Sequence, residues 1–211
     1  MKVCEIFASI QGESAHAGLP CVFVRLTGCN LRCAYCDTAY AYEEGIDMTV
    51  DSVVSAVGKY GFDLVEITGG EPLLQADALE LASRLLDAGF RVLIETNGST
   101  DIGRVDKRAI VIMDVKTPGS GAADSVCVGN FDFLKKKDEL KFVLCDRADY
   151  EWSVNFVRRH SLLNKCAVLF SPAYGRLDPA ELSGWILEDR LPVRLNLQLH
   201  KYIFNPDRRG V

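Results

Sequence analysis

Three cysteines near the start of the chain have the spacing C-x3-C-x2-C: Cys29, Cys33 and Cys36. A loop can bring three such thiols to one metal centre, whereas a strand would send alternate side chains to opposite faces. Zinc and an iron–sulfur cluster are the two candidates. A structural zinc ion takes four protein ligands, and none of the three histidines is spaced to complete a local zinc site. A 4Fe-4S cluster held by three thiolates keeps one iron with an open coordination position, which is a place for chemistry.

Four polar segments share a second pattern. The sequence reads TGGEP at 68–72, ETNG at 95–98, DVKTPGSG at 114–121 and FSPAYG at 170–175. Each follows or ends a short apolar run that predicts a strand. Ligands of α/β proteins gather at the carboxyl ends of the strands. We therefore expect these segments to meet at one edge of the sheet.

The elements that must position these residues are predicted by the alternation of β-branched runs with amphipathic runs, which is typical of βα units in a parallel sheet. The predicted strands are 3–10, 21–26, 64–67, 91–95, 110–115, 140–144, 167–170 and 193–197. The predicted helices are 49–61, 75–89, 147–160 and 178–189. We expect one α/β domain over residues 1–211. The length is below the roughly 250 residues of a full eight-stranded barrel, so a partial barrel and a doubly wound sheet both remain open.

Composition and charge argue against several classes of protein. A content of 48% hydrophobic and 25% charged residues is that of an ordinary globular protein. The net charge of -5 argues against a protein that binds nucleic acid or an anionic membrane. No apolar run reaches about 20 residues, and the first residues lack the apolar region of a signal peptide. We expect a cytoplasmic protein that contacts no membrane.

Two further features receive structural explanations. The densest basic run, KKKDELK at 135–141, is interpreted as a solvated helix end. The other five of the eight cysteines lie in apolar or strand-like contexts, where a free thiol behaves as a small hydrophobe. We therefore expect these five to pack in the core: Cys4, Cys21, Cys127, Cys145 and Cys166.

The cysteine loop at 28–38, with Tyr35 before its last cysteine, resembles the signature of radical S-adenosylmethionine (SAM) enzymes, and TGGEP resembles the GGEP motif of that family. The resemblance implies a single-domain partial, open βα barrel that holds a 4Fe-4S cluster and SAM. It also implies that an electron from the cluster cleaves SAM and that the resulting 5′-deoxyadenosyl radical abstracts a hydrogen from the substrate. The cofactor then supplies the difficult chemistry, and the protein selects the hydrogen.

A closer resemblance covers nearly the whole chain, from IQGE at 10–13 to QLHK at 198–201, and includes Arg25 and the CDT that ends the loop. In these features the chain is similar to the 7-carboxy-7-deazaguanine synthases. That family converts 6-carboxy-5,6,7,8-tetrahydropterin to 7-carboxy-7-deazaguanine with loss of ammonia, on the route to queuosine. The resemblance implies a carbon–nitrogen lyase, a homodimer, and an electron donor such as flavodoxin or ferredoxin.

The resemblance also implies three sets of site residues. The substrate set is Ile10, Gln11, Gly12, Glu13, Arg25, Thr68, His200 and Val211. The SAM set is Tyr35, Cys36, Asp37, Gly70, Glu71, Glu95, Asp114, Val115, Lys116, Ser171, Pro172, Ala173 and Tyr174. The metal set is Cys29, Cys33 and Cys36 for the cluster and Thr38 for Mg²⁺.

The donor and acceptor groups of several of these side chains suit the roles that the resemblance implies. The guanidinium of Arg25 offers a fork of donors to a carboxylate, and the amide of Gln11 can donate to and accept from a pterin edge. Glu95 can accept both hydroxyls of a ribose, and one protein oxygen suffices for Mg²⁺, which usually keeps several waters. Ser14 stands where the family often has glycine after QGE, so we expect a tight or hydrogen-bonded turn there.

Other interpretations remain open at this stage. Arg25 can be a surface charge, Thr38 a turn cap, His200 a core histidine, and Glu95 with Lys116 an exposed pair at the rim. A radical SAM activase, which makes a glycyl radical on a partner protein, has the same cysteine spacing and GGEP. A zinc-binding structural module is the alternative that is not an enzyme.

Overall fold

The computed structural model describes residues 1–206 and 208–211. Its centre is one open sheet of nine strands in the order β3-β1-β2-β4-β5-β6-β7-β8-β9. Strand β1 pairs antiparallel with β2 and β3, and each later pair from β2–β4 to β8–β9 is parallel. The strands are β1 (Lys2–Ile10), β2 (Pro20–Leu26), β3 (Ile46–Asp47), β4 (Leu64–Gly69), β5 (Arg91–Thr96), β6 (Ile110–Asp114), β7 (Glu139–Leu144), β8 (Ala167–Pro172) and β9 (Arg194–Leu195).

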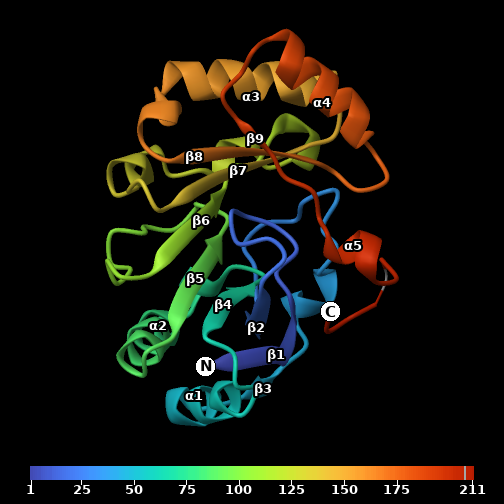
Figure 1. Cartoon of the computed structure of the whole chain (residues 1–211). Coiled ribbons are helices and arrows are strands. Elements are labelled where there is room, and N and C mark those ends of the chain that lie inside the picture. Colours follow the sequence, from blue (N-terminus) through green and yellow to red (C-terminus); the bar gives the residue numbers. More distant parts are fainter. Residues whose placement is uncertain (207) are drawn as a thin grey trace.

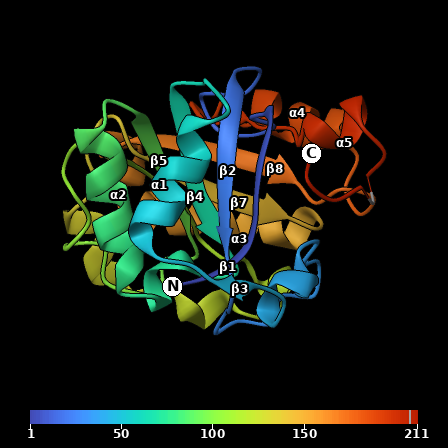
Figure 2. The ribbon, with the colours of Figure 1, turned by 90° about the horizontal axis from the view of Figure 1, so that it is seen from below.

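The sheet curves, and four helices cover its outer face (Figure 1). These four are α1 (Val50–Gly58), α2 (Asp77–Asp87), α3 (Arg147–Arg159) and α4 (Pro179–Glu188), and a short helix α5 (His200–Ile203) follows them in the chain. Both views place α1 and α2 side by side, and α5 lies with residue 211 on the open side of the curve (Figure 2). An open, curved sheet with outer helices is the partial barrel, not a flat doubly wound sheet. One continuous core joins the strands to the helices through buried aliphatic side chains.

Helices α1 and α4 begin at the capping residues that the sequence predicts for them. The Thr49 hydroxyl accepts a hydrogen bond from the Ser52 N–H at the start of α1, and the Asp178 carboxylate accepts one from the Ala180 N–H at the start of α4. These side chains satisfy N–H groups that the first turn of a helix leaves unpaired. Pro179 lies in the first turn of α4, where a missing N–H costs nothing. Local capping therefore sets these boundaries.

Several predicted elements need correction. The predicted strand 193–197 is reduced to the two residues of β9, and the pattern gave no sign of β3, of α5 or of six short 3-10 helices. The basic run at 135–141 is not a helix end, because residues 135–138 form a turn and Lys141 lies buried on β7. A lysine between apolar neighbours in a strand marks a buried charge better than a solvated one.

The prediction for the five other cysteines is only partly confirmed. Cys21 and Cys166 are buried, whereas Cys4 and Cys145 are half-buried and Cys127 is exposed. Cys127 precedes a 3-10 helix, Val128–Asp132, in the long connection between β6 and β7, so no strand carries it into the core. None of the helices in the described part of the chain has the length and apolar character that a membrane crossing requires.

Candidate active site

A cavity lies over the carboxyl ends of the parallel strands, and most of the predicted site residues line it. The substrate-set residues that line it are Ile10, Gln11, Gly12, Glu13, Arg25, Thr68, His200 and Val211. From the SAM and metal sets it is lined by Tyr35, Asp37, Gly70, Glu95, Asp114, Lys116, Ala173, Tyr174, Cys29, Cys33, Cys36 and Thr38. Four predicted residues lie outside its lining: Glu71, Val115, Ser171 and Pro172. The four polar segments therefore meet at one edge, as predicted.

Backbone contacts hold the loop that carries the three cysteines. The Gly28 N–H donates to the Ala41 carbonyl over 2.8 Å, and the Ala34 N–H donates to the Ser120 carbonyl over 2.9 Å. The Arg176 guanidinium, from the β8–α4 connection, donates to the Ala34 carbonyl over 2.6 Å. All three cysteines of the loop are half-buried free thiols. The last two of these contacts tie the loop to segments that lie more than 80 residues away in sequence.

The two glycines of TGGEP are required by close contacts with the end of β2 and with the start of this loop. A Cβ at Gly69, which has φ +154°, would lie 2.3 Å from the Leu26 carbonyl oxygen. A Cβ at Gly70 would lie 2.2 Å from the Gly28 carbonyl oxygen and 2.7 Å from the Cβ of Cys29. Real Cβ atoms do not approach backbone so closely, so both positions need glycine. Gly69 therefore lets the TGGEP turn pack on the end of β2, Gly70 lets it pack on the cysteine loop, and both glycines line the cavity.

The Glu71 carboxylate forms hydrogen bonds with other residues of the protein. Its fully buried carboxylate accepts hydrogen bonds from the Thr96 hydroxyl over 2.8 Å and from the Asn97 and Leu73 N–H groups. These contacts join the TGGEP turn to the end of β5. The sequence prediction assigns Glu71 to the SAM set. In the structure its carboxylate makes the hydrogen bonds to the end of β5 and does not line the cavity.

Two buried polar atoms near the cysteines are suited to receive a bound cofactor. The Asp114 carboxylate pairs through Oδ2 with the Lys116 ammonium over 2.5 Å. Among the described residues, Asp114 Oδ1 and the Tyr35 hydroxyl are buried without a hydrogen-bond partner. A buried polar atom without a partner costs about 1–3 kcal/mol, which a polar ligand in the cavity would recover. Lys116 thus pairs with Asp114, and the interpretation of Lys116 and Glu95 as an exposed rim pair is wrong.

The thiols themselves suit a cluster better than a single metal ion. In the described part of the chain, no three Cys, His, Asp or Glu side chains converge closely enough to hold one ion. A 4Fe-4S cluster does not demand such convergence, because each thiolate binds a different iron. Thr38 precedes the 3-10 helix Ala39–Tyr42, but its hydroxyl does not cap that helix and lies 3.8 Å from the Cys36 sulfur at the cavity. The interpretation of Thr38 as a turn cap is therefore not supported.

Arg25 on β2 faces the cavity and is not a surface charge. Its Nε donates to Glu5 Oε1 over 2.8 Å, and the Tyr40 hydroxyl donates to the same oxygen over 2.8 Å. The guanidinium also lies over the Phe7 ring, with 5.7 Å from Cζ to the ring centre. These contacts fix the Arg25 plane through Nε, which orients the outer N–H groups for a bidentate partner.

A buried polar network forms the floor of the cavity. The Gln11 side chain donates from Nε2 to Glu66 through a short contact, and its Oε1 accepts from the Glu13 N–H over 2.5 Å. Burial and the nearby Glu95 carboxylate raise the pKa of Glu66 well above its usual range, which favours the neutral acid. The amide orientation of Gln11 is therefore set by the protein, with one N–H remaining for a ligand.

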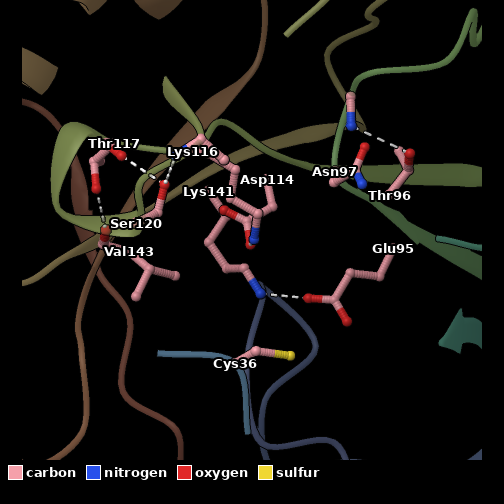
Figure 3. A network of polar contacts seen from close by, with 12 residues as sticks. Cys36, Glu95, Thr96, Asn97, Asp114, Lys116, Thr117, Ser120, Lys141 and Val143 are labelled. Carbon is pink, nitrogen blue, oxygen red and sulfur yellow. Dashed lines mark hydrogen bonds and ion pairs between the residues drawn. The ribbon is translucent and has the colours of Figure 1, made fainter. Parts of the chain in front are cut away.

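Lys141 is a buried residue of the cavity that the sequence pattern does not single out. Its ammonium donates to Glu13 Oε2 over 2.8 Å. It also donates to Glu95 through a shorter contact (Figure 3). Although burial opposes the charged forms, the Lys141 ammonium lowers the pKa of Glu95 to about 2, and the carboxylates raise the pKa of Lys141. The available signal was the strand sequence ELKFVL, in which a lysine stands at a position that the parallel sheet buries.

The C-terminal segment closes one side of the cavity. A Cβ at Gly12 would lie 2.2 Å from His200 Nδ1, so the imidazole packs directly on the QGE backbone. The Leu199 N–H donates to the Gly12 carbonyl over 2.9 Å. Ser14 has φ +65°, in the left-handed region, and its hydroxyl accepts from the His16 N–H over 3.0 Å. The predicted tight, hydrogen-bonded turn after QGE is confirmed.

Comparisons with known proteins agree with this geometry. Residues 23–114 match the radical SAM superfamily model. The chain is 48% identical over 214 residues to a 7-carboxy-7-deazaguanine synthase of Chlorobaculum tepidum, covering 100% of this chain and 97% of the relative. It is 46% identical to the enzyme of the same name from Koribacter versatilis, covering 100% of both chains.

Solved structures show the same fold. The crystal structure of QueE from Escherichia coli superimposes with a TM-score of 0.78, at 23% identity over 94% of each chain. Streptococcus suis SuiB superimposes with a TM-score of 0.59, at 14% identity over 82% of this chain and 47% of SuiB. The expected partial open barrel of the radical SAM type is confirmed. Because its relatives match over the full length at this identity, the chain belongs to the 7-carboxy-7-deazaguanine synthase family of radical SAM enzymes.

Proposed function

We propose that this enzyme converts 6-carboxy-5,6,7,8-tetrahydropterin to 7-carboxy-7-deazaguanine with loss of ammonia, as a carbon–nitrogen lyase in queuosine biosynthesis. The observation that carries the proposal is the full-length match to synthases of that name, joined to one cavity that collects the residues expected for cluster, SAM and pterin. The activase and zinc-module alternatives offer no reason for the arrangement of Gln11, Arg25 and Thr38 around that cavity.

Cys29, Cys33 and Cys36 would hold a 4Fe-4S cluster, and SAM would lie between the loop and the strand ends. When bound, the cluster and SAM would supply the radical chemistry that removes a hydrogen atom from the substrate. Asp114 and Tyr35 offer the unpartnered polar atoms described above, and Glu95 offers carboxylate oxygens to the ribose. The backbone at 36–37, 70–71, 115 and 171–174 completes the proposed SAM set.

The remaining residues of the cavity orient the pterin. Arg25, held by Glu5, binds the 6-carboxylate through its outer N–H groups. Gln11 and Glu13 form hydrogen bonds with the pyrimidine edge of the pterin. Thr68 on β4 and His200 on α5 form further hydrogen bonds with the same substrate. Ile10, Gly12 and Val211 complete the proposed substrate set. Enclosure of the pterin by the C-terminal segment excludes water from the reacting carbon.

Several finer assignments belong to the same proposal. Thr38 provides the protein oxygen for a Mg²⁺ ion that also binds the substrate, as suits a hard cation that keeps several waters. Residues 1–211 act as one catalytic domain in a cytoplasmic homodimer. A flavodoxin or ferredoxin delivers the electron. These assignments derive from the sequence resemblance and are compatible with the positions of Thr38 and the cluster loop at the cavity.

The test is an anaerobic assay of the reconstituted protein with SAM, a reductant, Mg²⁺ and 6-carboxytetrahydropterin, followed by mass spectrometry. Formation of 7-carboxy-7-deazaguanine with regeneration of SAM is the expected result. Release of 5′-deoxyadenosine without the product would contradict the proposal in favour of an activase. Absence of both, from protein that contains zinc and is colourless, would favour the structural module.

The Mg²⁺ assignment has its own test. The Thr38→Ala enzyme should need about tenfold more Mg²⁺ for half-maximal rate. In this variant a water molecule replaces the hydroxyl as a ligand of the ion, and the protein does not hold that water in place. The matched control is Thr49→Ala at the start of α1, which lies away from the cavity. An unchanged Mg²⁺ dependence in Thr38→Ala would remove Thr38 from the metal site.

A further inference from the structure

Lys141 lies between two carboxylates that come from different parts of the chain. Its side chain is 5% exposed and extends from β7 into the cavity. Glu13 belongs to the turn after β1, and Glu95 lies in β5, one residue before the strand ends. Figure 3 shows the ammonium directed at Glu95, with the Cys36 sulfur in the same region. One cation thus joins the part of the cavity beside the QGE turn to the part beside the cysteine loop.

Each of the two carboxylates also has a second donor. Gln198, just before α5, donates to Glu13 Oε1 over 3.0 Å. The Thr68 hydroxyl on β4 donates to Glu95 Oε2 over 2.9 Å. Each of the four carboxylate oxygens of Glu13 and Glu95 therefore accepts one hydrogen bond, and Lys141 is the donor that the two carboxylates share. Removal of one member of such a buried set leaves the others with uncompensated charge.

We propose that Lys141 is a positioning residue that makes the binding of SAM and the binding of the pterin interdependent. The proposal rests on the function proposed above, in which Glu13 contacts the pterin and Glu95 contacts SAM. A ligand that fixes one carboxylate also fixes the shared ammonium, and the ammonium in turn fixes the other carboxylate. The second ligand then loses less conformational freedom on binding, which is positive cooperativity.

The test is calorimetric titration of SAM into the cluster-loaded enzyme, without reductant so that no turnover occurs, in the absence and presence of saturating 6-carboxytetrahydropterin. In the unaltered enzyme the pterin should tighten SAM binding at least about fivefold, the lower end of typical coupling between sites. In Lys141→Met each ligand should bind about tenfold more weakly, and the coupling should fall to less than about twofold. Lys141→Arg, which keeps the charge, should retain part of the coupling.

The matched control is Lys136→Met, which removes an exposed lysine whose ammonium donates only to the Asn164 carbonyl among its described contacts. Its two affinities and their coupling should equal those of the unaltered enzyme. If Lys141→Met does not fold, the Lys141→Met/Glu95→Gln double variant removes one negative charge with the positive one, and it should show the same loss of coupling. A folded variant without the ammonium that keeps the coupling would overturn the proposal.

Failure of this inference can be told apart from failure of the proposed function. An unaltered enzyme that makes the product and binds both ligands independently would overturn only the role of Lys141. An unaltered enzyme that neither binds the pterin nor makes the product would overturn the proposed function. A Lys141→Met enzyme that loses affinity for one ligand alone would also contradict the shared position of the ammonium.

Discussion

The two sides of the cavity are held in different ways. The cysteine loop is held by backbone contacts, and the closest of these requires glycine at 70. The floor, by contrast, is held by polar and charged side chains from β4, β5, β7 and the turn after β1, with Lys141 between Glu13 and Glu95 and Gln11 against Glu66. Steric contacts between backbones do not depend on pH, whereas a buried charge network does. Changes in side-chain size should therefore disturb the loop side of the cavity, and changes in charge or pH should disturb the floor.

The largest expected effect is on the loop side. Cys36→Ser should lower activity by more than about a hundredfold, because an alkoxide is a poor substitute for a thiolate on iron. Iron content and visible absorbance of the reconstituted protein measure the loss directly. The matched control is Cys127→Ser, at an exposed cysteine, which should keep both values. Equal iron content in the two variants would remove Cys36 from the cluster site.

Gly70→Ala tests whether backbone contact holds the loop. The added Cβ would lie 2.2 Å from the Gly28 carbonyl oxygen, so the free energy of unfolding should fall by about 2–3 kcal/mol, and cluster loading should fall with it. Urea unfolding measures the first and iron analysis the second. Gly58→Ala in α1 is the opposite control, because its Cβ meets nothing within 4 Å and alanine should stabilise the helix by about 0.5–1 kcal/mol. Equal stability of the two variants would contradict the steric explanation.

Glu66→Gln tests the electrostatics of the floor. Burial and Glu95 raise the pKa of Glu66 above its ordinary value of 4.5, so the neutral acid stabilises the fold fully below pH 4.5 and loses that contribution as the pH rises toward the raised pKa. The glutamine keeps an oxygen for Gln11 and cannot ionise. Its advantage in unfolding free energy should therefore grow with pH and reach on the order of 1 kcal/mol by pH 6.

Urea unfolding of both proteins at a series of pH values measures this difference. Glu151→Gln, at an exposed ion pair on α3, is the control and should show no comparable trend. A Glu66→Gln protein whose stability runs parallel to that of the unaltered enzyme from pH 4.5 to 8 would show that Glu66 is ionised in the folded state.

The smallest expected effect concerns Glu5, which touches Arg25 and does not line the cavity. Glu5→Gln keeps an acceptor but removes the charge that orients the guanidinium, so the KM for the pterin should rise about threefold while kcat stays nearly constant. Steady-state kinetics over a range of pterin concentrations measure the two constants. A fall in kcat without a change in KM would show that Glu5 acts on something other than substrate binding.

The sequence alone determined the features that depend on short-range pattern. The cysteine spacing, TGGEP and the QGE turn lie within a few residues each, and capping residues such as Thr49 mark helix starts locally. The prediction of the strand ends followed from apolar runs and agrees with the structure to within two residues at the predicted strands. The exception is the last strand, where only Arg194–Leu195 pair with β8. Resemblance to a known family then supplied residue roles that spacing does not contain.

Only the tertiary structure decided which distant side chains share a contact. The pattern at 135–141 predicts a solvated Lys141 because this is the densest basic run of the chain, yet the parallel pairing of β7 with β6 and β8 buries it beside Glu95. The roles of Glu71 and Glu5 likewise depend on partners 25 and 20 residues away. Hydrophobic periodicity records whether a strand is buried, but the partner of a buried charge is set by strand order and register, which no local pattern encodes.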